Sequence, residues 1–399
     1  MSVTTDAGKA SYRIETLKQR AIKKADALAP ALFDLSDRIY HNPELGYAEH
    51  KASRWLTEFL SAHGFTVDHR IAGLETSFRA VATGRAQGPV VALLAEYDAL
   101  PEIGHGCGHN AIGVAACGAA AALSAVLPEL KGSVLVLGCP AEEGAVDGAG
   151  GKVVLVRNGE FDAVDAAMMV HPASRFVVVS SSAARVALKV IFSGSDPQSA
   201  ALLAFNGMNA LRQQFQRDVM IHGILKRASA VAVHGEDAPG ACEIRVYVRA
   251  SDSLRLSEWE RKVRECIRGA AFSADCEAEI GYTSPTYEEL VTNQTLAGAF
   301  IRNLRYLGAT VDEPDDSGIG STDMGNVSHV APALHAYVAT CPRGVAGHTR
   351  EFGRATLTRE GHQGLLLGAK ALAMTVIDLV EDEELLKRVK GEFEALVRR

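Results

Sequence analysis

The sequence predicts an α/β protein into which a second, smaller α+β domain is inserted, and three observations lead to this prediction. In the first half of the chain, strands that are apolar on both faces alternate with helices, which is typical of a mostly parallel sheet covered by helices. From about residue 185 the order of the elements changes, and long helices return only after about residue 290. The length of 399 residues also exceeds what one compact core usually holds.

The larger domain is expected to use both ends of the chain. Two helices are expected before residue 60, joined by the Pro- and Gly-containing connection His41–His50. Continuous apolar runs then predict three buried strands, at Val90–Ala95, Ser133–Gly138 and Asp165–Val170. A helix is expected after each of the first two. A short strand at Ala333–Ala339 and a final helical pair complete this domain, which we assign to residues 1–184 and 290–399.

The inserted domain is expected at residues 185–289. Its first strand alternates polar and apolar residues, so one face of that strand should be exposed. The expected strands are Arg185–Phe192, Met220–Leu225, Cys242–Ala250 and Cys276–Tyr282. The expected helices are Ser199–Gln216 and Ser257–Ala271. The resulting order β-α-β-β-α-β is the ferredoxin-like arrangement.

Composition and charge argue against several classes of protein. With 47% hydrophobic and 22% charged residues, the chain is typical of a soluble globular protein. The net charge of −7 and the lack of a long basic run argue against a nucleic-acid or anionic-membrane partner. We find no apolar window of signal-peptide or transmembrane length, so no membrane association is expected. Seven cysteines, an odd number without a CxxC pair, favour a reducing cytoplasm over a disulfide framework.

Side chains that can ligate a metal or move a proton follow the predicted parallel strands at the point where each strand ends. In chain order they are Asp98, Cys107, His109, Glu142, Glu143, His171 and His348. Parallel strands bring their carboxyl ends to a common edge of the sheet, where open α/β sheets place their sites. We therefore expect these residues to converge on one crevice, although most of them are far apart in the sequence.

The chemistry of this set favours a metal centre. Thiolate, imidazole and carboxylate ligands together suit zinc or manganese better than magnesium or calcium. The expected ligands are Cys107, His109, Glu143, His171 and His348. Five protein ligands exceed the need of one tetrahedral ion and are about right for two ions that share groups. Glu142 is then a spare carboxylate beside the metals, which is what the general base of a hydrolase must be.

Each residue also has an ordinary structural interpretation. Free cysteines such as Cys107 are usually small buried hydrophobes, and a single histidine at a strand end, such as His171, is usually hydrogen-bonded structure. The segment "AEEG" is also common in surface turns. Joint placement at strand ends favours the metal site. We expect His105 to lie outside the ligand set, and we interpret as structural His41, His50, His63, His69, His329, His335 and His362.

Several motifs resemble, in order and spacing, the amidohydrolase branch of the aminoacylase/metallo-carboxypeptidase family. They are "HNPELGYAE", "AEYDALPEIGHGCGHN", "PAEEG…GGK", "MMVHP", "STDMGNVSHVAP" and "HTREF". The similarity covers nearly the whole chain and is strongest to aminobenzoyl-glutamate hydrolase subunits and aminoacylase-1-like dipeptidases. It implies a catalytic domain with two divalent ions, zinc or manganese with cobalt as a further option, and an inserted lid domain that also forms a homodimer.

The resemblance also implies roles for single residues. The metal ligands are again Cys107, His109, Glu143, His171 and His348. Glu142 is the implied general base, and Asp98 is implied to orient a ligand, as carboxylates behind metal-bound histidines do. Arg249, in "YVRA", matches an arginine that lies near the substrate carboxylate in relatives.

Two positions in the predicted lid depart from the family. Relatives carry a histidine that reaches across the dimer and stabilises the oxyanion of the scissile carbonyl, whereas this chain has Gln198 in "SGSDPQSA". Relatives also carry an asparagine where this chain has Glu236 in "HGEDAP". If the substrate is an amide, His234 is one of two candidates to substitute for the missing histidine, and Gln198 is the other. Gln198 can donate a hydrogen bond too, but without a charge.

These observations predict a hydrolase that cleaves a C–N bond in a small, carboxylate-bearing substrate. The leading hypothesis is the amide of an N-acyl or N-aroyl amino acid or a dipeptide. A second is hydrolytic deamination of an activated aromatic amine such as a nitroanthranilate, because no carbonyl oxyanion forms there and the lid histidine is dispensable. Arg249 suits both substrates. A third, from another class, is a catalytically silent regulatory subunit, which a complete ligand set disfavours.

Overall fold

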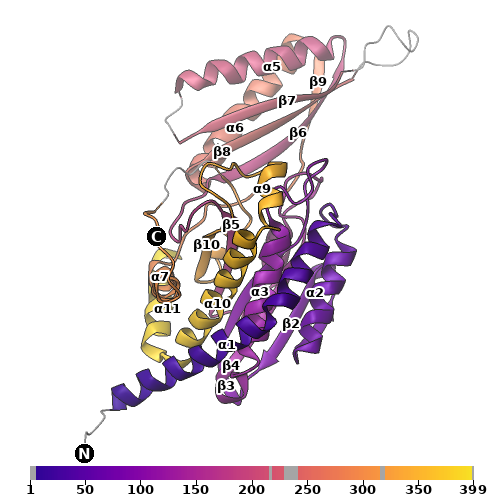
Figure 1. Ribbon diagram of the computed structural model, residues 1–399. Helices are drawn as coiled ribbons and strands as arrows, with labels where there is room; N and C mark the ends of the chain where they lie inside the picture. The colour runs from indigo at the N-terminus through magenta and orange to yellow at the C-terminus, as the bar shows by residue number, and fades with distance from the viewer. Residues whose placement is uncertain (1–5, 215–217, 229–240, 315–319, 398–399) are drawn as a thin grey trace, which may run out of the picture.

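The computed structural model describes residues 6–214, 218–228, 241–314 and 320–397. It contains two sheets that lie one above the other in Figure 1. The larger sheet has six strands in the order β1-β2-β4-β3-β5-β10, and the smaller has four in the order β7-β8-β6-β9. The α/β fold with a mainly parallel sheet, predicted from the sequence, is confirmed.

The larger sheet is parallel where the predicted ligands follow its strands. Its members are β1 (Thr66–His69), β2 (Phe78–Thr83), β3 (Ala86–Glu96), β4 (Lys131–Cys139), β5 (Ala166–Ala173) and β10 (Ala333–Ala339). β4, β3, β5 and β10 are parallel neighbours, so their carboxyl ends share one edge. β1 and β2 extend the sheet with antiparallel pairing. The sequence analysis missed these two strands because they are short and only half-buried, without the long apolar runs of the parallel ones.

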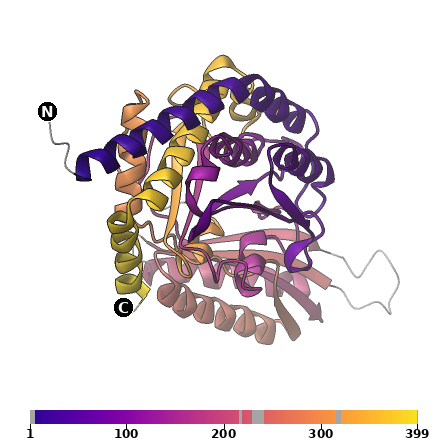
Figure 2. The same ribbon diagram turned by 90° about the horizontal axis from the view of Figure 1, so that it is seen from below.

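Helices cover both faces of this sheet. α1 (Asp6–Tyr40), α3 (His109–Leu123) and α10 (Arg359–Glu381) pack against one another on one face, and Figure 2 shows indigo α1 and yellow α10 on the same side. α3 is fully buried because its small residues allow close packing: a methyl group at Gly118 would lie 2.9 Å from Leu32 Cδ1. The remaining helices are α2 (His50–Ala62), α4 (Gly151–Arg157), α7 (Gln294–Tyr306), α8 (Met324–Ser328), α9 (Arg350–Ala355) and α11 (Glu383–Val397).

One expectation about membranes needs correction. The sequence analysis found no window of transmembrane length, but α10 is long and apolar enough to cross a membrane. In the fold, 72% of its most apolar window is buried inside the protein. A helix buried in a protein core can match a membrane span in both length and apolar composition. α10 is such a core helix, because it packs against α3, α1 and β5.

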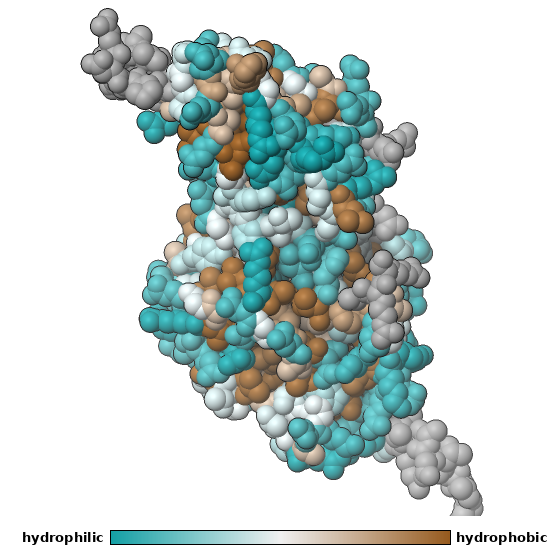
Figure 3. Space-filling model, turned by 180° about the vertical axis from the view of Figure 1, so that it is seen from behind, coloured by the Kyte–Doolittle hydropathy of each residue, from teal (hydrophilic) through white to brown (hydrophobic). Residues whose placement is uncertain are grey.

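The smaller sheet has the predicted order of elements. They are β6 (Ala184–Gly194), α5 (Pro197–Leu211), β7 (Met220–Ala228), β8 (Ala241–Ala250), α6 (Ser253–Ser273) and β9 (Cys276–Tyr282). Asp196 and Asp252 cap α5 and α6 by accepting backbone N–H bonds. β6 lies between β8 and β9, so β7 and β9 form the edges. Seen from behind, a pale band of intermediate hydropathy separates this upper part from the larger part below (Figure 3).

Candidate metal centre

The predicted ligands meet at the carboxyl-terminal edge of the larger sheet. β3 ends at Glu96 and Asp98 follows two residues later, while Glu142 and Glu143 follow β4. His171 lies near the end of β5. Because β4, β3 and β5 are parallel neighbours, these segments leave the sheet side by side.

A tight turn before α3 places two of the predicted ligands. Gly108 has a φ of 82°, and a methyl group there would lie 2.9 Å from Pro172 Cγ, so a side chain at this position would meet both strain and a clash. His109 then begins α3, and its Nδ1 lies 2.8 Å from Asp98 Oδ1. The other Asp98 oxygen accepts the backbone N–H of Glu143 at 3.0 Å. Asp98 therefore fixes the direction of the His109 ring and the turn that carries Glu143.

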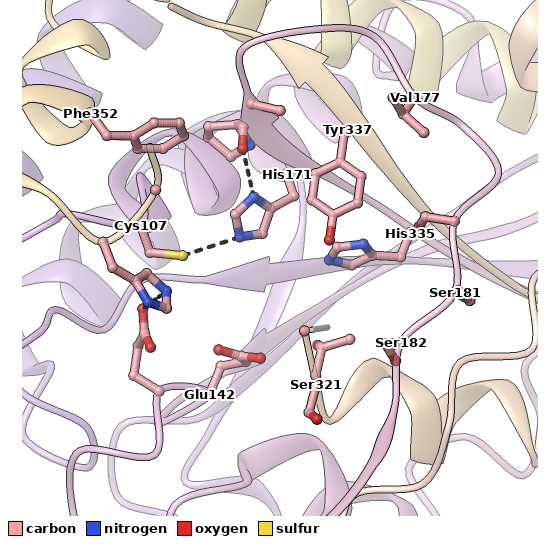
Figure 4. Close-up of a pocket in the computed structure, with 18 of the residues that line it drawn as sticks. Cys107, Glu142, His171, Val177, Ser181, Ser182, Ser321, His335, Tyr337 and Phe352 are labelled. Atoms are coloured by element: carbon pink, nitrogen blue, oxygen red, sulfur yellow. Dashed lines mark hydrogen bonds and ion pairs between the residues drawn. The ribbon is translucent and has the colours of Figure 1, made fainter. Parts of the chain in front are cut away.

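The structure brings all five predicted ligands together in two groups. Cys107 Sγ lies 3.3 Å from His171 Nε2 (Figure 4), and His109 completes this first group. Cys107 also belongs to the second group, with Glu143 and His348, whose Nε2 lies 3.7 Å from Glu143 Oε1. The backbone of His348 is held at a φ of 59° by its N–H bond to a carbonyl of the turn before α3.

The donor atoms of these side chains fit a metal. His109 Nε2 and Glu143 Oε1 are buried, lie 3.8 Å apart, and have no hydrogen-bond partner among the described residues. Unpaired polar atoms in a protein interior cost free energy, and a cation placed between them would remove that cost. Burial, together with the nearby imidazoles of His335 and His109, lowers the pKa of His171 to about 3, so its ring is neutral and able to ligate.

Behind the ligands lies a buried ion cluster that the sequence analysis did not identify. Lys152 Nζ lies 2.5 Å from Glu96 Oε1 and also contacts Asp323. Burial opposes the charge on Glu96, yet Lys152 and His109 lower its pKa to about 2. Glu96 Oε2 in turn lies 3.5 Å from His109 Nε2. A signal was present in the sequence, because Glu96 directly follows the predicted strand Val90–Ala95 and the motifs "GGK" and "STDMG" contain the other two residues.

Glu142, the predicted general base, projects into the pocket (Figure 4). Burial raises its pKa well above the usual range, and the carboxylates of Glu96, Asp323 and Glu143 raise it further. Its backbone carbonyl accepts the Tyr287 hydroxyl at 2.9 Å. A side chain held in this environment binds a proton more readily than an exposed glutamate does, which suits a group that takes up a proton and passes it on.

The pocket beside this cluster has a volume of about 680 Å³. Arg249, predicted to lie near the substrate, lines it, and so does His335, which the sequence analysis had interpreted as structural. The His335 ring centroid lies 5.5 Å from that of His171. His335 was missed because it lies within a strand, where a histidine at an ordinary core position looks the same.

Other predicted residues lie elsewhere. Gln198 is exposed at the start of α5 and does not line the pocket of its own chain. His234 and Glu236 lie outside the described residues. His105 is buried and belongs to neither ligand group.

Comparison with known proteins identifies the family to which this site belongs. Residues 92–359 match peptidase family M20/M25/M40. The chain belongs to this family. It is 35% identical to the Xaa-Arg dipeptidase of Mus musculus, over 95% of this chain and 93% of the relative. It is 26% identical to a subunit of the p-aminobenzoyl-glutamate hydrolase of Escherichia coli, over 90% of this chain and 91% of that relative.

A solved structure of the same family supports the fold. It is from Bacillus subtilis, is described as a dinuclear metal binding peptidase, and superposes with a TM-score of 0.66 at 20% identity, covering 89% of this chain and 99% of the other. The resemblance noted from the motifs is thus confirmed as membership of the M20/M25/M40 family. This chain is accordingly a metal-dependent hydrolase of C–N bonds, and the family match spans every predicted ligand from Cys107 to His348.

Proposed function

We propose that the protein hydrolyses the amide bond of an N-acyl or N-aroyl amino acid, or of a dipeptide. The observation that carries this proposal is the convergence of five ligands and Glu142 on one pocket that also contains Arg249. The pocket volume of about 680 Å³ is ordinary for a small ligand. The relatives named above act on a dipeptide and on an aminobenzoyl-glutamate, which are both amides with a free carboxylate.

The two ligand groups would hold two divalent ions, and Cys107 belongs to both groups. His109 and His171 would complete one site, and Glu143 and His348 the other. The mixture of sulfur, nitrogen and oxygen favours zinc or manganese, with cobalt as a further option. Bound ions supply Lewis-acid polarisation of the carbonyl and lower the pKa of water. Asp98 keeps His109 aimed at the centre through its 2.8 Å contact with Nδ1.

The remaining steps belong to side chains of this chain. Glu142 takes a proton from the attacking water and delivers it to the leaving nitrogen. Arg249 binds the carboxylate of the substrate and so sets the distance from that carboxylate to the scissile bond. At Gln198 and Glu236 this chain differs from its relatives in residues that are expected to contact the substrate. All five proposed metal ligands are nevertheless present.

The four-stranded part, which we assign to residues 185–289 as a lid, is proposed to form a homodimer. The first strand of this part, expected at Arg185–Phe192, offers no free edge to a second copy, because β6 lies between β8 and β9. β7 is one of the two edges and carries the exposed apolar residues Ile224 and Leu225, and Leu202 and Leu203 are exposed on α5. An apolar edge strand is suited to pairing with a second copy. Sedimentation velocity tests this: a monomer at micromolar concentration would contradict it.

We propose that the enzyme works in the cytoplasm. All seven cysteines are free, and burial raises the pKa of Cys117 and Cys139. Such thiols stay reduced in a compartment kept at low potential. Fractionation of cells with an antibody against the protein tests the assignment, and recovery from an extracellular or organellar fraction would contradict it.

Metal analysis combined with kinetics tests the proposed chemistry. His171→Ala should lose bound zinc or manganese and amidase activity together, because His171 supplies a ligand to the first group. His69→Ala, a change of an exposed histidine on β1, is the matched control and should keep both. Full metal occupancy and turnover in His171→Ala would refute the ligand assignment.

A further inference from the structure

The proposed base Glu142 follows an alanine whose backbone is in an unusual conformation. Ala141 and Glu142 lie just beyond β4 and belong to no helix or strand. Ala141 is fully buried and has a φ of 54°. Residues other than glycine rarely adopt a positive φ, because their Cβ then crowds the backbone. Since Ala141 directly precedes Glu142, its conformation sets the direction in which Glu142 enters the pocket.

Glu49 holds the backbone of Ala141 in this conformation. Glu49 is fully buried at the N-cap of α2, where a polar side chain commonly accepts an N–H of its own helix, but it makes no such bond. Its Oε1 accepts the Ala141 N–H at 2.8 Å instead, and its Oε2 accepts the Thr76 hydroxyl at 2.6 Å. The Ala141 carbonyl accepts the Gly150 N–H at 2.7 Å. Both polar groups of the Ala141 backbone are therefore paired.

The residues just before Glu49 pack against the same loop. A methyl group at Gly46 would lie 2.7 Å from Ala141 Cβ, so a glycine is needed there to make room for the alanine. Tyr47 donates its hydroxyl to the carbonyl of Gly148 at 2.7 Å. The motif "HNPELGYAE", which has no part in the proposed reaction steps, thus lies along the segment that carries the base.

Two other side chains hold the peptide groups that follow Ala141. Tyr287 donates its hydroxyl to the Glu142 carbonyl, and Asp98 accepts the Glu143 N–H. Tyr287 also lines the pocket, and Asp98 also contacts His109, so a change at either would disturb more than the base. Glu49 belongs to neither ligand group and does not line the pocket. Its contact with Ala141 can therefore be tested separately from metal binding.

We infer that Glu49 is a positioning residue, which keeps Ala141 in the left-handed conformation and thereby aims Glu142 at the attacking water. The buried hydrogen bond from Ala141 to Glu49 offsets the conformational cost of the positive φ. Without this bond, Ala141 relaxes toward an ordinary backbone conformation and Glu142 turns away from the reacting atoms. The inference rests on the proposed role of Glu142 as the general base.

Three variants test the inference on N-benzoyl-glutamate. Glu49→Ala should lower kcat by about 10- to 100-fold with little change in KM or bound metal, because a small misplacement of a reacting group has a cost of this order. Glu49→Gln keeps an oxygen for the Ala141 N–H and should retain most of kcat. Ala141→Gly added to Glu49→Ala should restore a large part of kcat, because glycine adopts a positive φ without help. A purely structural role of Glu49 predicts no such rescue.

Glu44→Ala is the matched control. Glu44 lies in the same connection between α1 and α2, and its carboxylate accepts the backbone N–H groups of Lys51 and Ala52 at 2.8 and 3.0 Å. Its loss should lower the Tm, as the loss of a helix cap does, and leave kcat unchanged. An equal loss of kcat in Glu44→Ala and Glu49→Ala, or no rescue by Ala141→Gly, would overturn the inference.

Failure of the proposed function gives a different result. If the wild type cleaves no amide in any metal form, amide hydrolysis is refuted, and hydrogen–deuterium exchange of a peptide that covers residues 140–145 decides the inference. This peptide should exchange faster in Glu49→Ala than in the wild type, and at the wild-type rate in Glu49→Gln. Unchanged exchange in Glu49→Ala would show that Glu49 does not hold Ala141 and would overturn the inference.

Discussion

The two walls of the pocket differ in both charge and construction. The edge of the larger sheet brings together thiol, imidazole and carboxylate groups in the arrangement proposed to hold metal ions. The face of β6 and β8 presents Arg185 and Arg249, which are register partners, and contributes no carboxylate to the described pocket lining. The first wall carries the bond-breaking chemistry that a whole family shares. The second belongs to the four-stranded part of the chain, whose sequence departs from the family pattern at Gln198 and Glu236.

The largest expected effects concern the two neighbouring glutamates of the first wall. Glu142→Gln should keep its metal but lose about 10²- to 10⁴-fold in kcat, the range that a general base contributes. Glu143→Gln should lose metal as well, because Glu143 lies among the ligands. Metal analysis of both purified variants separates the roles. Metal loss in Glu142→Gln with retention in Glu143→Gln would show that base and ligand are reversed.

A change behind the same wall should act on stability. Lys152→Met leaves Glu96 and Asp323 buried without their cation, and breaking a buried pair in this way costs about 3–5 kcal/mol. Urea unfolding at neutral pH measures the loss. Arg54→Met is the control, because the Arg54–Glu58 pair is exposed and contributes about 0–1 kcal/mol. Similar losses in both variants would contradict the importance of the buried cluster.

Asp98→Asn should have a moderate effect on the metal centre. The amide no longer offers a carboxylate to His109 Nδ1, and losing such a partner lowers metal affinity by about 10- to 100-fold. Competition with a chelator measures the affinity directly. An unchanged dissociation constant for the metal, with the fold intact, would show that Asp98 does not support metal binding.

The smallest effect is expected at Gln198, which lies outside the pocket of its own chain. If the substrate is an amide, Gln198→His should preserve amidase activity or raise it by up to about tenfold, because the oxyanion gains a stronger donor. Steady-state kinetics on an N-acyl amino acid and on an aminobenzoate make the comparison. A clear loss on the amide would mean that Gln198 has its own role in this enzyme.

The residues at the edge of the larger sheet were largely predictable from the sequence, whereas the position of Arg185 on the face of β6 and β8 was not. Strand ends are visible as the ends of apolar runs, so Cys107, His109 and His171 could be assigned to one edge of the sheet from the residue pattern alone. Arg185 begins a strand that the sequence predicts to be half-exposed, and nothing local distinguishes it from a solvated arginine. Its buried position depends on the register with Arg249 and on stacking over Tyr287. Such cross-strand contacts arise from tertiary structure, which periodicity does not encode.

The buried ion cluster is a third case, in which the residues were visible in the sequence but their contacts were not. It consists of Glu96, Lys152 and Asp323. Their residue types were visible, but a buried lysine is rare and a charged residue is ordinarily assigned to the surface. Only the fold reveals that a residue from β3, one from α4 and one before α8 meet in the interior.

The account's central claim is that this is a metal-dependent amidase. Its most direct test measures product release by the wild type from N-benzoyl-glutamate and from an aminobenzoate, before and after chelation and after zinc or manganese is restored. The account predicts release of glutamate that chelation abolishes and metal restores. Ammonia release from the aminobenzoate, with no cleavage of the amide in any metal form, would contradict it.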